Sequence, residues 1–243
     1  MRRIALFTFC LLTSNLFSQC NTSGCLDTSF GTSGIVITSP QTSVSAVVVY
    51  PATAPVELAG KIVIAGQAAR TGSPGRHAFL ARYSATGVLD TGFGSNGFVI
   101  PILAQGDSSS SYDGITLDSG NNIVAVGSSG NGSYWYVARF TPLGVSDSGL
   151  QGTGNVFAAC PKNNACGYNA VTVQGNSIIA AGSAHGVYVR RYTSSGLLDS
   201  SFGSNGTQII PGWDSPVGVA IQTIDNDARV VVAVTCPRFL VQS

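Results

Sequence analysis

Three arginines each stand eight residues before an aspartate, and their types and spacing are the most suggestive of chemistry in this sequence. The pairs are Arg82 with Asp90, Arg139 with Asp147, and Arg191 with Asp199. A guanidinium and a carboxylate held close together can form a charge-assisted ion pair or can take part in acid and base catalysis. Because an active-site pair is not expected three times in one chain, we interpret them as structural ion pairs that bridge a turn.

Six other side chains have the size or charge to recognise a ligand, and they are Arg70, Arg76, His77, His185, Trp213 and Asp214. Trp213 could stack on a sugar or an apolar side chain, and the alternative is a buried tryptophan that seals a junction between sheets. His77 and His185 are expected in surface loops and not as metal ligands, because no carboxylate cluster accompanies them. We therefore predict candidate binding residues, with no catalytic residue, metal or cofactor.

An extracellular glycosidase or lyase is the alternative to a binding function. Such an enzyme needs converging carboxylates, or a histidine with partners. The segments that could line a central channel offer chiefly Asp113, Asp118 and Asp225. The sequence Asp225-Asn226-Asp227 lacks the later ligands of a calcium loop and fits a tight hairpin turn better.

The six cysteines fit an oxidising compartment. Cys160 and Cys166 flank a short loop between two expected strands, so their side chains should meet in a disulfide, with two free thiols as the alternative. Zinc is disfavoured because the sequence has no pair of Cys-x-x-Cys motifs and only two histidines. The pairing of Cys20, Cys25 and Cys236 stays open.

The N-terminus has the pattern of a signal peptide over residues 1–19, with Arg2 and Arg3 followed by an apolar stretch. A lipid anchor at Cys20 is disfavoured because Gln19 stands where a small residue is needed. No other segment is apolar for long enough to span a membrane as a helix. The net charge of +1 gives no field that would recruit nucleic acid. We expect a protein outside the cytoplasm: secreted, periplasmic or at the cell surface.

A phrase of the form Leu-Asp-x-x-Phe-Gly recurs along the chain and defines the elements that must position these residues. Its aspartates are Asp27, Asp90, Asp147 and Asp199, spaced by 63, 57 and 52 residues. Its aromatic residues are Phe30, Phe93 and Phe202. We expect the aspartate to accept backbone N–H bonds in a turn, the phenylalanine to fill a seam, and the glycine to adopt a positive φ. A period of this size is typical of an array of small antiparallel sheets.

Between successive phrases lie the same four short apolar segments, rich in β-branched and aromatic residues. We expect strands at 44–50, 61–66, 78–83, 97–102, 112–118, 121–127, 134–140, 155–159, 168–174, 177–182, 187–192, 207–211, 217–224, 229–234 and 239–243. No apolar period near 3.6 persists, which excludes helix. The second segment of each unit is apolar on both faces, so a sheet must cover each side of it.

These patterns predict an all-β fold, a β-propeller of about four four-stranded antiparallel blades, with residues 20–243 as a single domain. The repeats run over about 24–83, 87–140, 144–192 and 196–243. We expect the N-terminal strand at 34–38 to close the last blade by pairing with 239–243, which removes the open sheet edge. The alternatives are a fragment, or half of a two-chain ring that self-associates if the ring is open.

The repeated pattern resembles the bacterial delta-60 repeat, a β-propeller family of unknown function. The resemblance is specific at 60–83, 87–97 and 195–206, and looser at 144–154, where Leu150 and Gln151 replace Phe and Gly. It implies a propeller fold and a secreted or surface location, and it brings no catalytic residue.

The loops that join the second to the third strand and the fourth to the next first strand should share one face of the propeller. They are 67–77, 102–111, 128–133, 160–167, 183–186 and 211–216. These loops vary, and variable loops on a rigid scaffold commonly bind ligands. We therefore expect a non-catalytic scaffold that binds a protein or a glycan.

Overall fold

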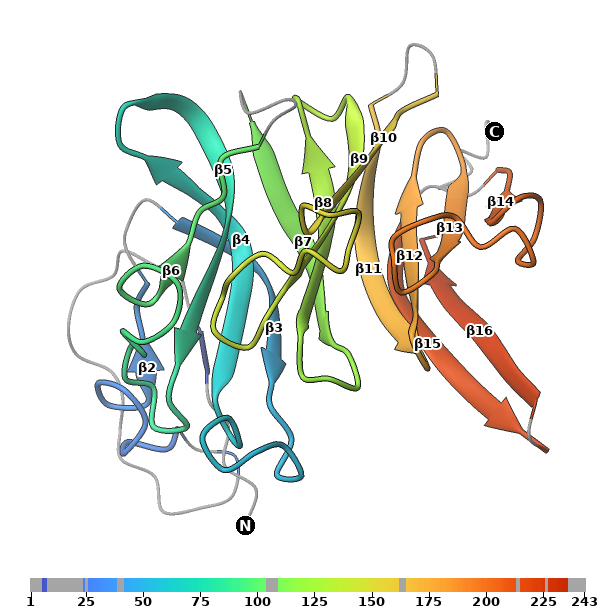
Figure 1. Cartoon of the computed structure of the whole chain (residues 1–243). Helices are drawn as coiled ribbons and strands as arrows, with labels where there is room; N and C mark the ends of the chain where they lie inside the picture. Colours follow the sequence, from blue (N-terminus) through green and yellow to red (C-terminus); the bar gives the residue numbers. More distant parts are fainter. Residues whose placement is uncertain are drawn as a thin grey trace, which may run out of the picture.

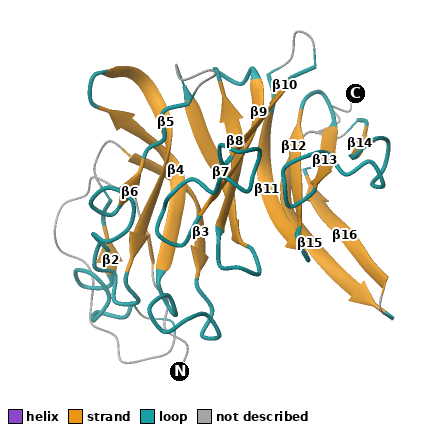
Figure 2. Ribbon diagram, viewed as in Figure 1, coloured by secondary structure: helices purple, strands orange, loops and turns teal. Residues whose placement is uncertain are grey.

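The computed structural model describes residues 6–7, 24, 26–38, 42–103, 109–161, 165–212, 215–225 and 227–235. Every regular element in these ranges is a strand (Figure 2), which confirms the all-β prediction. No helix in the described ranges is long and apolar enough to cross a membrane. The signal-peptide prediction falls almost wholly outside the described residues, as do Cys20, Cys25 and Cys236.

Three four-stranded antiparallel sheets follow one another along the chain. The first sheet contains β3 (Thr42–Val49), β4 (Ile62–Arg70), β5 (Ser73–Tyr83) and β6 (Phe98–Val99). The second contains β7 (Ser110–Leu117), β8 (Ile123–Ser129), β9 (Tyr134–Phe140) and β10 (Asn155–Ala159). The third contains β11 (Gly167–Gln174), β12 (Ser177–Ser183), β13 (Val187–Tyr192) and β14 (Thr207–Ile210).

The last sheet has two strands in the described residues, β15 (Pro216–Ile224) and β16 (Asp227–Val234). The sheets stand side by side in a row (Figure 1), and the first strands β3, β7, β11 and β15 contact one another in that order. This arrangement of repeated antiparallel sheets is consistent with a β-propeller, in which the first strands line the centre.

Apolar cores fill the spaces between neighbouring sheets, as the two-faced second strands require. Val63 and Ala65 of β4 pack with Tyr112 and Tyr136 between the first and second sheets. The adjacent residue Trp135 faces the other way, into the core between the second and third sheets. Side chains alternate between the two faces of a strand, so one strand contributes to two cores.

The first strand of each sheet has a register shift at the same place, which shows that the sheets are copies of one unit. The shifts lie at Val44/Ala46, Tyr112/Gly114, Tyr168/Ala170 and Pro216/Gly218. Opposite the first three lie the glycines Gly66, Gly127 and Gly182. A Cβ on Gly66 would lie 1.9 Å from the Ser43 carbonyl oxygen, so the bulge excludes a side chain there.

Among the described residues, no hydrogen bonds close the sheets into a ring. The N-terminal strand β2 (Ile35–Val36) pairs in parallel with β1 (Leu6–Phe7). Its predicted partner, 239–243, lies outside the described residues. In Figure 1, β2 and the β15–β16 pair lie at opposite ends of the row. Phe30 and Val36 instead bury against Ile64 and other residues on the outer face of the first sheet.

The hairpin between β4 and β5 is tighter than predicted. Residues 67–77 were expected to form a loop, but cross-strand pairing continues through Ala68 opposite His77 and Ala69 opposite Arg76. Conversely, the strand predicted at 97–102 is limited to the two residues of β6. The β4–β5 hairpin differs from the prediction because its backbone pairing extends through polar residues of types common in loops.

Candidate functional site

The connections between strands lie at the two ends of the sheets, and these two ends differ chemically. We call the turns between third and fourth strands, residues 84–97, 141–154 and 193–206, the turn edge. The opposite edge, which we call the loop edge, holds the β4–β5, β8–β9 and β12–β13 hairpins and the connection from β10 to β11. Consecutive antiparallel strands reverse direction, so these two groups of connections lie at opposite ends of the sheets.

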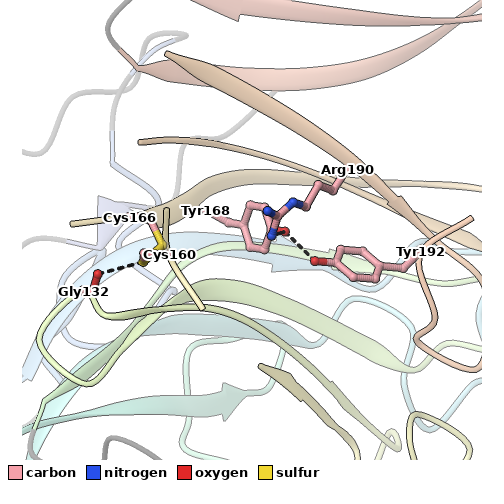
Figure 3. Close-up of a disulfide and its surroundings, with 6 residues drawn as sticks. All are labelled: Gly132, Cys160, Cys166, Tyr168, Arg190 and Tyr192. Atoms are coloured by element: carbon pink, nitrogen blue, oxygen red, sulfur yellow. Dashed lines mark hydrogen bonds between the residues drawn. A yellow bond between two sulfur atoms is a disulfide. The ribbon is translucent and has the colours of Figure 1, made fainter. Parts of the chain in front are cut away.

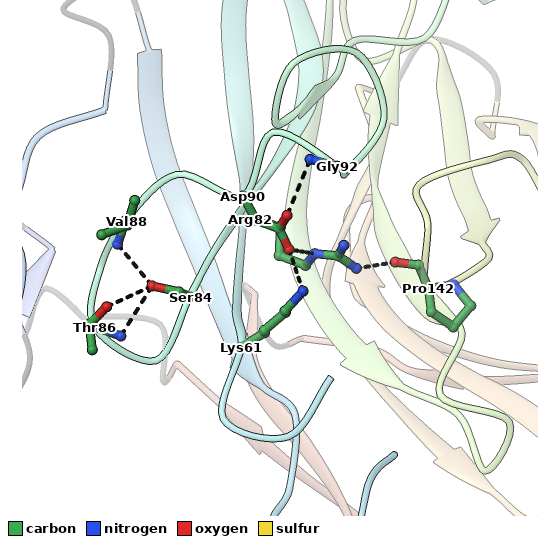
Figure 4. Close-up of polar contacts among 8 residues, drawn as sticks. All are labelled: Lys61, Arg82, Ser84, Thr86, Val88, Asp90, Gly92 and Pro142. Carbon is green, nitrogen blue, oxygen red and sulfur yellow. Dashed lines mark hydrogen bonds and ion pairs between the residues drawn. The ribbon is translucent and has the colours of Figure 1, made fainter. Parts of the chain in front are cut away.

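The turn edge of the first sheet is built around the Arg82 guanidinium (Figure 4). Arg82 Nε donates to Asp90 Oδ2 at 2.8 Å, and a second guanidinium nitrogen donates to the Pro142 carbonyl in the second sheet. The guanidinium lies 4.8 Å from the centre of the Phe93 ring. Lys61 Nζ also contacts Asp90 Oδ2, at 2.7 Å. The ion pair therefore links a turn to the neighbouring sheet, and the Arg82 side chain is only 3% exposed.

The other two predicted pairs are also present, with different surroundings. Arg139 Nε lies 2.6 Å from Asp147 Oδ2, and its Nη1 donates to the Ser194 carbonyl in the third sheet at 2.9 Å. Arg191 Nε lies 2.8 Å from Asp199 Oδ2, but its Nη2 donates to Ser201 Oγ within its own turn. The first two arginines thus join consecutive sheets, whereas Arg191 bonds to Asp199 and Ser201 in the turn of its own sheet.

Asp90 and Asp199 of the turn edge are held as carboxylates. Burial raises the pKa of Asp90, but the hydrogen bond from Lys61 and the charges of Arg82 and Lys61 outweigh it, so the pKa of Asp90 is below its ordinary value. Hydrogen bonds from Ser201 lower the pKa of Asp199, with Arg191 adding to the effect. A carboxylate with a lowered pKa and filled acceptor positions is a weak base, so this edge is suited to structure.

Of the six candidate binding residues, the four in the described part of the chain belong to two different hairpins, β4–β5 and β12–β13. Arg70 donates to the Pro101 carbonyl at 3.2 Å and to Ser73 Oγ at 3.1 Å, and Arg76 donates to the Gln67 carbonyl at 3.3 Å. His77 is fully buried in β5, so its expected place in a surface loop is wrong. His185 is exposed at the tip of the β12–β13 hairpin with φ 53°. Trp213 and Asp214 lie outside the described residues.

The predicted disulfide between Cys160 and Cys166 is present on the loop edge (Figure 3), with a Cα–Cα distance of 5.7 Å. Backbone bonds tie it to the β8–β9 hairpin. Cys166 N donates to the Gly132 carbonyl at 2.9 Å, and Cys160 N donates to the Ser133 carbonyl at 3.0 Å. The connection from β10 to β11 is therefore fastened to the neighbouring hairpin. Disulfides of this kind are typical of extracytoplasmic compartments.

The sequence did not predict a polar and aromatic cluster that lies between the second and third sheets. The Arg190 guanidinium lies 4.9 Å from the centre of the Trp135 ring and 3.4 Å from Tyr168 Oη, which is 2.5 Å from Tyr192 Oη. Burial raises the pKa of Tyr168 well above 10. The available signal was Arg190 itself, because Ala81 and Ala138 stand at the equivalent positions before the ion-pair arginines. Its cation packs on aromatic faces and stiffens the junction.

The acidic residues considered for catalysis are not arranged as a pair. Asp113 accepts from Ser111 Oγ at 2.9 Å, and burial raises its pKa. Asp118 accepts from the backbone N–H groups of Gly120 and Asn122, both at 2.9 Å, as a turn residue. In the described part of the chain, no three His, Cys, Asp or Glu side chains are grouped to hold a metal ion.

The fold and its repeated turns define a β-propeller type of repeat protein. Comparison with family models agrees: residues 60–93 and 176–202 match the domain of unknown function (DUF5122) beta-propeller. The two segments cover the second and third strands and the start of the turn edge in the first and third sheets. A search of curated proteins gives no match. The family match supports a β-propeller repeat family of unknown function.

Proposed function

We propose that this protein is a non-catalytic, extracytoplasmic scaffold that binds a protein or a glycan through its loop edge. The observation that carries this proposal is the contrast between the two edges. The turn edge repeats one ion-paired structure, whereas the connections on the loop edge differ and one of them is fastened by the Cys160–Cys166 disulfide. A rigid scaffold with diverse loops is the usual basis of a binding surface.

The disulfide-fastened part of the loop edge is the best-defined candidate surface. Ser133 and Ala165 are exposed there, and His185 is exposed on the next hairpin. Rigid loops lose little conformational entropy on binding, which favours affinity. We further propose that the repeats are of the delta-60 type, on the strength of the phrases at 60–83, 87–97 and 195–206.

The test is a binding screen with defined soluble polysaccharides and purified extracellular proteins, using the oxidised full chain. Once a ligand is found, Ser133→Arg and Ala165→Arg should weaken its binding at least tenfold, because each adds bulk and charge to the candidate surface. Thr91→Arg, at an exposed position of the turn edge, is the matched control and should bind normally. Loss of binding in the control alone would place the binding site elsewhere and contradict the proposal.

The same screen also tests the alternative, a glycosidase or lyase. Cleavage products released by the wild-type chain and abolished by Asp113→Asn would show catalysis and overturn the non-catalytic proposal. Intact glycans in the presence of bound protein would support it.

A further inference from the structure

The end faces of the row of sheets have the composition of its internal junctions. Each internal junction joins what we call the trailing face of one sheet, which looks toward the next sheet, to the leading face of the sheet that follows. In the first junction, Val63 and Ala65 of the trailing face meet Tyr112 of the leading face. In the second, Val124 and Val126 meet Tyr168. Both junctions are apolar and fully buried at these positions.

The trailing face of the last sheet has the same residues but is uncovered in the described structure. The cross-strand register aligns Val231 with Val63, Val124 and Ile179 of the earlier sheets. Those three residues are 0% exposed, whereas Val231 is 46% exposed. Ala233, aligned with the buried Ala65, is also exposed. The trailing face of the last sheet therefore carries the apolar residues of an internal junction, but no described sheet packs against it.

The leading face of the first sheet is correspondingly open at its inner strand. Val44 of β3 occupies the position of Tyr112 and Tyr168, which are 0% exposed, yet Val44 is 37% exposed. The outer part of the same face is covered by Phe30 and Val36 of the N-terminal segment. The exposed part is what a preceding sheet would cover with its inner strands.

The N-terminal segment, residues 26–36, occupies the place of the outer strand of a preceding sheet. Gly31 N donates to the Thr86 carbonyl at 2.8 Å, just as Gly94 N donates to Leu143 and Gln151 N donates to Ser195 at the two internal junctions. Phe30 is buried in the same way as Phe93 and Leu150. The segment thus has the turn and the outer strand of the repeated unit.

We propose that the trailing face of the last sheet binds the leading face of the first sheet in a second copy of this chain, head to tail. The N-terminal segment of one copy then supplies the outer strand of the last sheet of its neighbour. Two observations support a second copy. Each internal junction joins a trailing face to a leading face of the same two kinds, and β2 and the β15–β16 pair lie at opposite ends of the row (Figure 1).

Such a contact is heterologous, because two different surfaces of the chain meet. It produces a closed ring if the rotation between copies closes, and a filament if it does not. Either assembly buries the apolar end faces.

The test compares the solution mass of the full chain with that of two end-face variants. Wild type should form species of two or more chains at micromolar concentration, measured by light scattering after size exclusion. Val231→Asp and Val44→Asp should each run at the single-chain mass, because each destroys one of the two faces. Val56→Asp, in an exposed loop residue at 93% exposure, is the matched control and should assemble as wild type does.

Mixing the two end-face variants separates this proposal from other forms of association. Each variant keeps one intact face, so an equimolar mixture should form a two-chain species that neither variant forms alone. A monomeric wild type would indicate closure within one chain or no association, and would overturn the proposal. Unchanged assembly of either variant, or failure of the mixture to pair while both retain the wild-type circular dichroism spectrum, would do the same.

Discussion

The first and third sheets carry the same ion pair in different surroundings. Their comparison shows how a neighbouring sheet changes the exposure of a repeated motif. Arg82 and Arg191 each place Nε 2.8 Å from an aspartate oxygen and stack on a phenylalanine. The Arg82 side chain is 3% exposed and bonds to the next sheet, whereas that of Arg191 is 22% exposed and bonds within its own turn. The local motif sets the pair, and the neighbouring sheet decides how far water is excluded from it.

Replacing the phenylalanine under each of the two arginines by alanine should give the largest difference in the free energy of unfolding. Phe93 is fully buried between sheets, so Phe93→Ala should lower the free energy of unfolding by about 4 kcal/mol. Phe202 is only half-buried, and Phe202→Ala should cost roughly 1–2 kcal/mol. Urea denaturation followed by tryptophan fluorescence measures both. Equal losses would show that the third turn is covered as well as the first.

Replacing each of the two arginines by alanine should give the next largest difference in the free energy of unfolding. Arg82→Ala leaves Asp90 and the Pro142 carbonyl without this donor in a buried site and should cost about 3 kcal/mol. Arg191→Ala removes a more exposed pair and should cost about 0.5 kcal/mol. The same denaturation experiment applies, and a reversal of this order would contradict the role assigned to the neighbouring sheet.

The pair in the second sheet sharpens the comparison because its burial is intermediate. The Arg139 side chain is 10% exposed and donates to Ser194 in the next sheet, but Leu150 replaces the stacking phenylalanine. Arg139→Ala should therefore cost about 2 kcal/mol, between the other two arginines. A loss as small as that of Arg191 would mean that the bond between sheets contributes little.

The smallest effect expected is a pH dependence. The folded pKa of Asp90 is lowered, so its contribution to stability is present above the unfolded value of about 3.9 and is lost as the pH falls through the folded pKa. Asp90→Asn should therefore flatten the loss of stability below about pH 4. Thermal unfolding between pH 7 and pH 2 measures this, with Asp118→Asn as a turn-residue control. An unchanged slope would show that Asp90 does not titrate with a lowered pKa.

The elements that depend on neighbours in the chain could be predicted from the sequence. The ion pairs follow from a fixed eight-residue spacing across one turn, and the disulfide follows from two cysteines at the ends of adjacent strands. The strands follow from short β-branched segments between glycine-rich turns. In each case the relevant partners are a few residues apart, so local geometry suffices.

Burial at the candidate site could not be predicted in the same way. His77 is flanked by residues typical of a loop, but pairing with Ala68 extends β5 through it, and its side chain is fully buried. Arg190 replaces an alanine of the repeat, and only the stacking of sheets places Trp135 beside it. The contact between Arg190 and Trp135 joins two different repeats, so no periodicity within one repeat indicates it.

The amino-acid sequence by itself determined the repeated unit: four short strands, a turn closed by an arginine–aspartate pair, and apolar residues on both faces of the second strand. The tertiary structure alone decided which faces of each copy are covered by a neighbouring sheet and which are exposed. The physical reason is that Val63 and Val231 have the same side chain and the same place in their sheets, but burial requires a second surface, and a residue cannot specify whether its neighbouring sheet is present.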